Sequence, residues 1–260
     1  AHHSLTDVLN PGVSNSALAP AQVAWFNQAR AADPNATLYV NDYSILASGG
    51  LTNTSHQQYL YDQVAYLKAQ GAPVGGIGFQ SHFGSANART TGDKLVQILD
   101  RYAQLGVDLA VTEFDMYGDG WTEASKAAYM RDFMTAVFAE KAVTGFTMWG
   151  FWDGQHFAGS APLFDADWNL KESGQAFMDL VFDQWWTDVS GTTDASGLYA
   201  TRGFLGDYAI DVTLAGKTTS YATTLDASGR ALTIVVPEPA TIGAIAGATL
   251  ILLRRRRRCA

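Results

Sequence analysis

The sequence predicts an α/β protein with a parallel sheet, and three observations carry that prediction. Helical and strand-like periodicities alternate from residue 20 to about residue 185. Each strand–helix unit is long enough for a βαβ crossover. Hydrophobic residues make up 47% of the 260 residues, which is enough to cover both faces of such a sheet. Four units fit either an open doubly wound sheet or half of an eight-stranded barrel, because a complete barrel needs about 250 residues.

The elements are expected in a regular order. The first helix spans 21–32 and ends at Asp33-Pro34-Asn35, because proline cannot continue a helix. Glycine follows the second and third helices, as Gly71 and Gly106, and it is the residue most often found just past a helix end. The remaining helices are predicted at 55–70, 91–105, 123–141 and 172–185, and the strands at 38–40, 74–79, 108–114 and 143–151.

Residues 187–236 differ in character from the part before them. They are rich in Thr, Gly, Ser and Asp, and apolar and polar residues alternate over 208–214 before a turn signal at Ala215-Gly216-Lys217. This pattern predicts a small antiparallel β module, and its few aromatic residues favour a structural spacer over a polysaccharide-binding module. The chain is therefore expected to consist of an α/β domain over 1–186, this module, and a tail over 237–260.

The tail places an apolar stretch between prolines and an arginine cluster. Pro237-Glu238-Pro239 precedes the apolar residues 240–253, and arginines fill 254–258. The stretch predicts a C-terminal hydrophobic helix with a transient inner-membrane contact, since an arginine cluster ends an apolar segment on the cytoplasmic side. The pattern resembles the PEP-CTERM sorting signal. That resemblance implies export to the cell envelope or the extracellular space, and processing by a sorting protease or transpeptidase.

Charge and cysteine content exclude several classes of protein. The chain has 17 Lys and Arg against 25 Asp and Glu, a net charge of −8, which argues against a nucleic-acid-binding surface. Its single cysteine, Cys259, excludes an intrachain disulfide and a cysteine-based zinc site. His2 and His3 have no carboxylates close to them in the sequence, so no metal site is predicted, and no cofactor is expected.

Each predicted strand ends in polar or aromatic side chains of the kind that bind sugars. These residues are Asn41, Asp42 and Tyr43, then Gln80, Ser81 and His82, then Glu113 and Asp115, then Trp149, Trp152 and Asp153. The carboxyl ends of parallel strands meet at one edge of a sheet, where binding and catalytic groups gather. A purely structural explanation would have to apply four times, so a sugar-binding edge is favoured.

Glu113 and Asp115 suggest glycoside hydrolysis. They lie two residues apart in a strand, so both point to the same face. A glycosidase needs two carboxyl groups that flank the scissile bond, and this pair is too close in sequence for that arrangement. We therefore expect one carboxylate to be the nucleophile and the other to support it, with His82 between them. Tryptophans at the fourth strand would stack on pyranose rings.

At these residues the sequence resembles glycoside hydrolase family 10, the (β/α)8-barrel xylanases. The matching motifs occupy 38–43, 76–82, 111–115, 149–153 and 162–165, in family order. The resemblance implies the second half of a TIM barrel, strands five to eight. It also implies a retaining endo-1,4-β-xylanase that acts on xylan, or a related β-1,4-linked polysaccharide, through a covalent glycosyl-enzyme.

The resemblance assigns roles to particular residues. Glu113 would be the nucleophile, with His82 and Asp115 as its supporting hydrogen-bond network. Substrate contacts are implied for Asn41, Tyr43, Gln80, Trp149, Trp152 and Phe157. Of these, Asn41 and Gln80 would position hydroxyl groups, Tyr43 would line the leaving-group side, and Trp149 would cover the sugar at the cleavage point. Phe157 or His156 stands where the family has a further tryptophan.

One family feature is missing from the sequence. The acid/base glutamate of the family follows the fourth barrel strand in a Trp-Asp-Val-Val-Asn-Glu-like motif, and no such motif occurs in the 260 residues. The first strand that can be placed, 38–40, matches the fifth strand of the family. We therefore expect the chain to begin after the fourth strand, as a fragment of a longer enzyme that is inactive or nearly so by itself.

Two other functions remain open at this point. The first is a surface carbohydrate-binding protein without catalysis, which would fit the missing acid/base group and the remaining aromatic residues. The second is a related hydrolase that acts on cellulose or mixed-linkage glucan.

Overall fold

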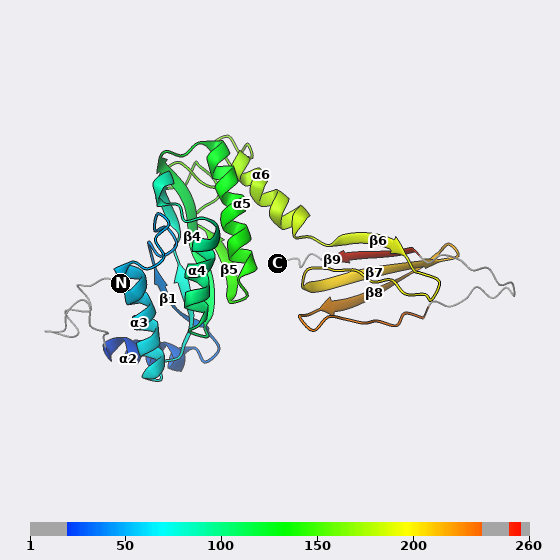
Figure 1. Ribbon diagram of the computed structural model, residues 1–260, viewed down its shortest axis with the longest axis horizontal. Coiled ribbons are helices and arrows are strands. Elements are labelled where there is room, and N and C mark those ends of the chain that lie inside the picture. The colour runs from blue at the N-terminus through cyan, green and yellow to red at the C-terminus, as the bar shows by residue number, and fades with distance from the viewer. Residues whose placement is uncertain (1–19, 236–249, 256–260) are drawn as a thin grey trace. The chain divides into compact units, whose positions relative to one another are not determined.

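The computed structural model describes residues 20–235 and 250–255 and divides into two compact units, Ala1–Phe177 and Met178–Ala260 (Figure 1). The division falls inside the last helix of the α/β part, whereas the sequence suggests a boundary after residue 186. His2, His3 and Cys259 lie outside the described residues.

The first unit alternates helices and strands, as predicted. Its elements are α2 (Pro20–Ala32), β1 (Leu38–Asp42), α3 (Ser55–Ala69), β2 (Val74–Phe79), β3 (His82–Ser85), a short 3-10 helix (Ala86–Ala88), α4 (Gly92–Ala103), β4 (Asp108–Asp119), α5 (Glu123–Ala139), β5 (Val143–Met148) and α6 (Glu172–Asp179). The hydroxyls of Thr54 and Thr122 cap α3 and α5 by accepting backbone N–H groups of the first turn, each at 3.1 Å.

The strands of the first unit form one parallel sheet. β1 pairs with β2, β2 with β4, and β4 with β5, so neighbours in the sheet follow one another along the chain. β3 continues beside β4 where β2 ends. A doubly wound sheet reverses its strand order, whereas a barrel does not. The observed order therefore favours the barrel segment over the doubly wound alternative.

Two differences from the predicted elements have one cause. β3 was not expected, and β4 runs to Asp119 although the apolar pattern predicts a strand only to residue 114. β3 pairs with the second half of β4, with His82 opposite Asp115 and Phe83 opposite Met116. Backbone pairing with β3 thus extends β4 past its apolar part and positions the polar residues of both strands.

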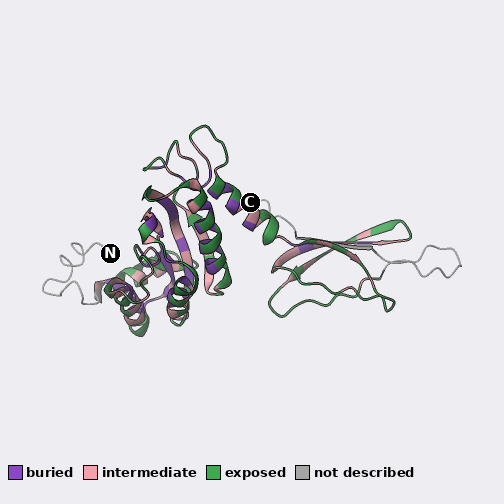
Figure 2. Ribbon diagram, turned by 45° about the horizontal axis from the view of Figure 1, so that its top comes forward, coloured by how far each residue is buried: buried purple, intermediate pink, exposed green. Residues whose placement is uncertain are grey.

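The core of the first unit is aromatic and lies between β4 and α5. Phe114 of β4 stacks on Phe133 of α5 with ring centroids 4.9 Å apart, and Phe83 and Tyr129 pack edge to face at 5.0 Å. All four side chains are buried, as are long stretches of the sheet (Figure 2). Burying one such ring stabilises the fold by about 1.5–3 kcal/mol. This packing holds β4, the strand that carries Glu113, rigidly against its helix.

The second unit contains the antiparallel sheet that the sequence predicts. A π-helical turn (Leu180–Gln184) leads to β6 (Asp188–Thr192), β7 (Gly206–Leu214) and β8 (Lys217–Leu225), and β9 (Leu250–Arg255) completes the order β6-β9-β7-β8. β7 and β8 form a hairpin through Ala215 and Gly216, which both have positive φ angles, as a two-residue type I′ turn requires.

The expected C-terminal helix is wrong for residues 250–255. These residues form β9, which pairs with β6 on one side and with β7 on the other. A short, continuous apolar run is compatible with either a buried strand or a helix, so its periodicity could not decide between them. Within the residues that the structure describes, no helix has the length and apolar character needed to cross a membrane. Residues 236–249 and 256–260, which include the Pro-Glu-Pro motif, lie outside the described residues.

Candidate active site

A β-bulge in β4 aims Glu113 toward β1. Val111 pairs with Phe146 and Phe114 with Met148, so β4 advances by three residues where β5 advances by two. A bulge turns side chains from their regular alternation and often occurs beside active sites. Here it brings both Thr112 and Glu113 into contact with Asn41, which lies near the carboxyl end of β1.

Asn41 holds one oxygen of the Glu113 carboxylate. Its Nδ2 donates to Oε1 of Glu113 at 3.1 Å, and its Oδ1 accepts the hydroxyl of Thr112 at 2.9 Å. Since a hydroxyl can donate only to the amide oxygen, this second bond orients the Asn41 amide with its N–H group toward Glu113. The Asn41 amide is therefore oriented to donate a hydrogen bond to the Glu113 carboxylate.

His82 lies between Glu113 and Asp115. Its Nε2 is 3.2 Å from Oε2 of Glu113, in hydrogen-bond geometry, and its Nδ1 is 2.9 Å from Oδ1 of Asp115. The second pair is an ion-pair contact rather than an aligned hydrogen bond. Each ring nitrogen of His82 faces a carboxylate oxygen, so the imidazole bridges Glu113 and Asp115.

A strained turn aims the imidazole. Ser81, between β2 and β3, is buried and has a φ of 67°, a left-handed conformation that side chains rarely adopt. Its Oγ donates to the carbonyl of Phe79 at 3.1 Å, and its own carbonyl accepts the backbone N–H of Asp115 at 3.4 Å. The turn separates β2 from β3 and sets the register that places His82 opposite Asp115.

His156 completes the cluster, although nothing in the sequence pointed to it beyond its place beside Phe157. Its Nδ1 accepts the backbone N–H groups of Ala158 and Ser160, both at 3.2 Å, so this nitrogen carries no proton. Nε2 therefore carries the proton and donates to Oδ2 of Asp115 at 3.3 Å. Both side chains are fully buried. Burial raises the pKa of Asp115, while the His82 and His156 contacts act in the opposite direction.

The predicted substrate contacts on the other strands fall into two groups. Trp149 joins the cluster: its ring packs edge-on against His82, with centroids 5.9 Å apart, and 48% of the residue is exposed. Tyr43 is 52% exposed at the end of β1, next to the ring of His56. Asp42 anchors this strand end, since its Oδ1 accepts the backbone N–H of Tyr43 and its carbonyl accepts that of Gln80.

Trp152 and Phe157 make other contacts. The ring of Trp152 stacks on Trp168, and its Nε1 donates to the carbonyl of Ala166 at 3.2 Å. Phe157 is 64% exposed and packs edge to face against Tyr117 at 5.0 Å. Their described contacts thus lie within β4 and the loops after β5, and no sequence pattern indicated the Trp168 partner.

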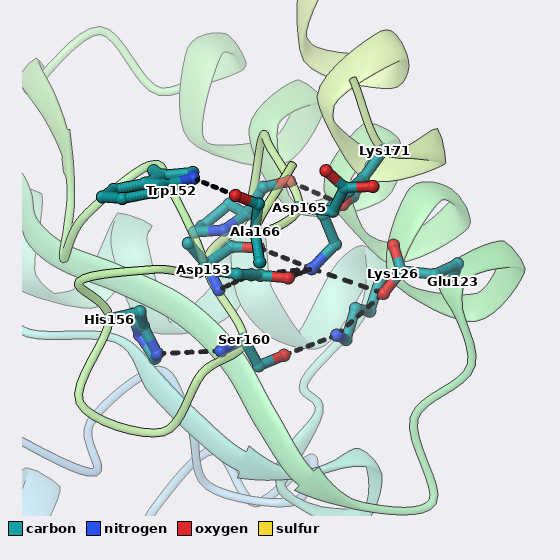
Figure 3. Close-up of polar contacts among 12 residues, drawn as sticks. Glu123, Lys126, Trp152, Asp153, His156, Ser160, Asp165, Ala166 and Lys171 are labelled. Carbon is teal, nitrogen blue, oxygen red and sulfur yellow. Dashed lines mark hydrogen bonds and ion pairs between the residues drawn. The ribbon is translucent and has the colours of Figure 1, made fainter. Parts of the chain in front are cut away.

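The loop that bears His156 is fixed by charged side chains (Figure 3). Lys171 binds both oxygens of Asp153 at 3.1 and 3.2 Å, and Asp153 accepts the backbone N–H of Ala161 at 2.6 Å. Lys126 of α5 donates to Ser160 at 2.7 Å and to Glu123 at 3.0 Å. Both lysines are nearly buried, so the Lys171–Asp153 ion pair and the Lys126–Ser160 hydrogen bond hold the loop more firmly than exposed contacts would.

Comparison with known proteins points to one family. Residues 22–180 match the model of glycosyl hydrolase family 10. The chain is 34% identical over 193 residues to anti-sigma-I factor RsgI6 of Acetivibrio thermocellus, and 33% identical over 191 residues to endo-1,4-beta-xylanase 1 of Arabidopsis thaliana. Each alignment covers 74% of this chain but only 24% and 19% of the respective relative.

Solved structures show the same likeness. Native xylanase 10B from Thermotoga maritima matches with a TM-score of 0.54 and 28% identity, over 63% of this chain and 52% of that chain. The intracellular xylanase TsXylA from Thermoanaerobacterium saccharolyticum, solved as a mutant in complex with xylotriose, matches with a TM-score of 0.51 and 31% identity, over 60% of this chain and 48% of that chain. The chain therefore spans about half the length of these xylanases.

Proposed function

The chain belongs to glycosyl hydrolase family 10, and from that membership we propose that the complete gene product is a retaining endo-1,4-β-xylanase with Glu113 as its nucleophile. One observation carries the proposal: Glu113 is held at both carboxylate oxygens, by Asn41 at 3.1 Å and by His82 at 3.2 Å. These two contacts fix the orientation of the carboxylate.

In the proposed reaction, Glu113 attacks the anomeric carbon and forms a covalent glycosyl-enzyme. The glycosidic bond breaks as an acid donates a proton to the leaving oxygen, and water then releases the sugar with net retention. His82 and Asp115 move no proton in these steps. They hold the Glu113 carboxylate in position while its bond to the anomeric carbon forms and breaks, and Trp149 covers one face of the reacting sugar.

The acid/base carboxyl group is not assigned to this chain. In a retaining enzyme it lies about 5–5.5 Å from the nucleophile. The family's Asn-Glu motif does not occur in the 260 residues, so we propose that residues 1–260 alone hydrolyse xylan slowly or not at all. General acid/base assistance typically accounts for about 10²–10⁴-fold in rate, which is the size of the expected deficit.

Xylan is the proposed substrate because several of the relatives are named endo-1,4-beta-xylanase. Relatives named endo-1,4-beta-xylanase match this chain at 30–36% identity, and the TsXylA structure holds xylotriose. A β-1,4-glucanase activity is the nearest variant, since Exoglucanase XynX of Acetivibrio thermocellus is 34% identical over 162 residues. Product analysis on xylan and on carboxymethylcellulose separates the two substrates.

A binding protein without catalysis is the second candidate. It is favoured by the relative at 34% identity that is named an anti-sigma-I factor rather than a hydrolase. Such a protein would bind a polysaccharide through the same aromatic edge without cleaving it. Loss of hydrolysis in Glu113→Gln would exclude this candidate.

Export is proposed on the tail motif. The Pro-Glu-Pro, apolar and arginine pattern of 237–258 supports sorting to the cell envelope or the outside of the cell by a transpeptidase-like protease, with a transient membrane contact. Replacement of Pro237, Glu238 and Pro239 by alanine, which leaves β9 in the chain, should then leave the protein unprocessed and shift it between cell fractions, as measured by immunoblotting.

The experiment for the enzyme uses the complete gene product. Glu113→Gln should lower the rate of xylan hydrolysis by at least about 10³-fold while the protein keeps its unfolding temperature. Glu172→Gln, an exposed glutamate in the first turn of α6, is the matched control and should leave the rate unchanged. Equal rates for Glu113→Gln and the wild type would reject the assignment of the nucleophile.

A further inference from the structure

We propose that Trp168, stacked on Trp152 and flanked by Phe151, forms a second sugar-binding platform that takes one pyranose ring of a β-1,4-linked chain. This aromatic shelf, defined as Phe151, Trp152 and Trp168, lies outside the cluster around Glu113. The nature of its ligand, a xylan-type chain, rests on the proposed function.

The two indole rings form a preorganised pair. Their planes lie 14° apart, with centroids at 4.7 Å, and Phe151 lies at 6.1 Å from Trp168 at an angle of 51°. The hydrogen bond from Trp152 Nε1 to the Ala166 carbonyl fixes the Trp152 ring (Figure 3). One face of Trp168 is thus occupied by Trp152, and the residue remains 56% exposed.

The backbone of Trp168 adopts a strained, left-handed conformation. Its φ angle is 67°, in the left-handed region that costs a large side chain of order 1–3 kcal/mol. The loop is held by Asp165, whose Oδ1 accepts the backbone N–H groups of Asp167 and Asn169 and whose Oδ2 accepts Asn169 Nδ2, all at 2.8–2.9 Å. Two backbone hydrogen bonds close the loop: the N–H of Asp165 donates to the carbonyl of Asn169, and the N–H of Trp168 donates to the carbonyl of Asp165.

Trp168 also contacts Phe164, with ring centroids 6.0 Å apart, yet packing against three aromatic rings leaves it largely exposed. A strained, tightly bonded loop that served the core would bury its largest side chain, whereas this one leaves more than half of a tryptophan in water. Strain that the surroundings enforce is typical of functional sites. A flat aromatic face held rigidly in solvent suits the C–H face of a pyranose, and rigidity lowers the entropy cost of binding.

The shelf belongs to the same edge of the sheet as the cluster. Phe151 and Trp152 closely follow Trp149 in the chain, and Trp149 packs on His82. Backbone hydrogen bonds from Phe164 to Phe151 and from Asp153 to Phe164 tie this segment to the stretch of chain that leads into the Trp168 loop. A polysaccharide held across Trp149 could therefore continue along the loops that form the shelf.

The test uses the complete gene product with Glu113→Gln, so that binding is measured without cleavage. Trp168→Gly removes the ring and relaxes the backbone, because glycine accepts a φ of 67° without strain. Trp168→Tyr keeps an aromatic face. Phe138→Ala, on α5 and 52% exposed, is the control for loss of an exposed aromatic ring elsewhere. Affinity for xylohexaose and for soluble xylan is measured by calorimetry and affinity electrophoresis.

We expect Trp168→Gly to weaken binding of xylohexaose about threefold to tenfold, Trp168→Tyr to restore most of it, and Phe138→Ala to change nothing. In the active protein, Trp168→Gly should raise KM for long chains with little change in kcat. The proposal is contradicted if Trp168→Gly binds xylohexaose as tightly as the parent Glu113→Gln protein, if Phe138→Ala loses as much affinity as Trp168→Gly, or if the parent does not bind xylohexaose. Because these are binding measurements, they remain valid if Glu113 proves not to be the nucleophile.

Discussion

His156 donates its Nε2 proton to the buried Oδ2 of Asp115 at 3.3 Å, while His82 contacts the other oxygen of the same carboxylate. Asp115 is thereby held between two imidazoles, of which one also contacts Glu113. The proposed nucleophile is thus linked, through His82 and Asp115, to a loop residue whose own described hydrogen bonds reach neither Glu113 nor His82.

The role of His156 gives the first prediction. His156→Phe fills the space but leaves Asp115 Oδ2 buried without its donor, which should destabilise the protein by about 1–3 kcal/mol. His156→Gln offers an amide donor near the same position and should recover part of this loss, together with part of kcat. Urea unfolding and xylan hydrolysis by the complete gene product measure both effects. A fully stable and active His156→Phe would show that Asp115 does not need this contact.

Asp115 gives a prediction about pH. Burial raises its pKa above the ordinary value of 3.8, so between these two values the native state binds more protons than the unfolded state. The contribution of this group to stability is therefore complete below pH 3.8 and is lost as pH rises through the native pKa. The stability of the wild type minus that of Asp115→Asn should decrease over this window.

Unfolding free energies of the two proteins between about pH 3 and pH 7 provide the measurement. A difference that grows as pH rises would mean that the imidazoles outweigh burial, and that the native pKa of Asp115 is lowered instead.

Ser81 gives a prediction about the turn before His82. Ser81→Gly should be close to neutral for stability, because glycine accepts the φ of 67° and loses only the bond to the Phe79 carbonyl. Ser81→Val places a β-branched side chain in a left-handed conformation, so it should cost about 1–3 kcal/mol and lower kcat by misplacing His82. Thermal unfolding and kinetics measure both, and equal behaviour of the two variants would show that the turn carries no strain.

Much of the site could be predicted from the sequence because it lies on regular elements. Glu113 and Asp115 lie on one strand, and the carboxyl ends of neighbouring parallel strands meet, which accounts for their position beside His82 and Asn41. Residues in irregular loops offered no such periodicity. His156 reaches Asp115, and Trp168 reaches Trp152, only through loop conformations fixed by side chains such as Asp153, Ser160 and Asp165.

The C-terminal tail shows why an apolar run does not determine its own secondary structure. The apolar run at 240–253 suggested a helix, whereas the backbone at 250–255 pairs on both sides as a central strand. Whether such a run forms a helix or a strand depends on which partners are available, and here β6 and β7 supply two backbone edges. Neither edge can be recognised from the run itself.

Covalent trapping of Glu113 tests the central claim most directly. The complete gene product is incubated with a 2-deoxy-2-fluoro-xylobioside that carries a good leaving group, and its peptides are analysed by mass spectrometry. We predict one fluoroxylobiosyl group on the peptide that contains Glu113, and none in Glu113→Gln. Label on another carboxylate, or no label in a protein that still cleaves xylan, would contradict the account.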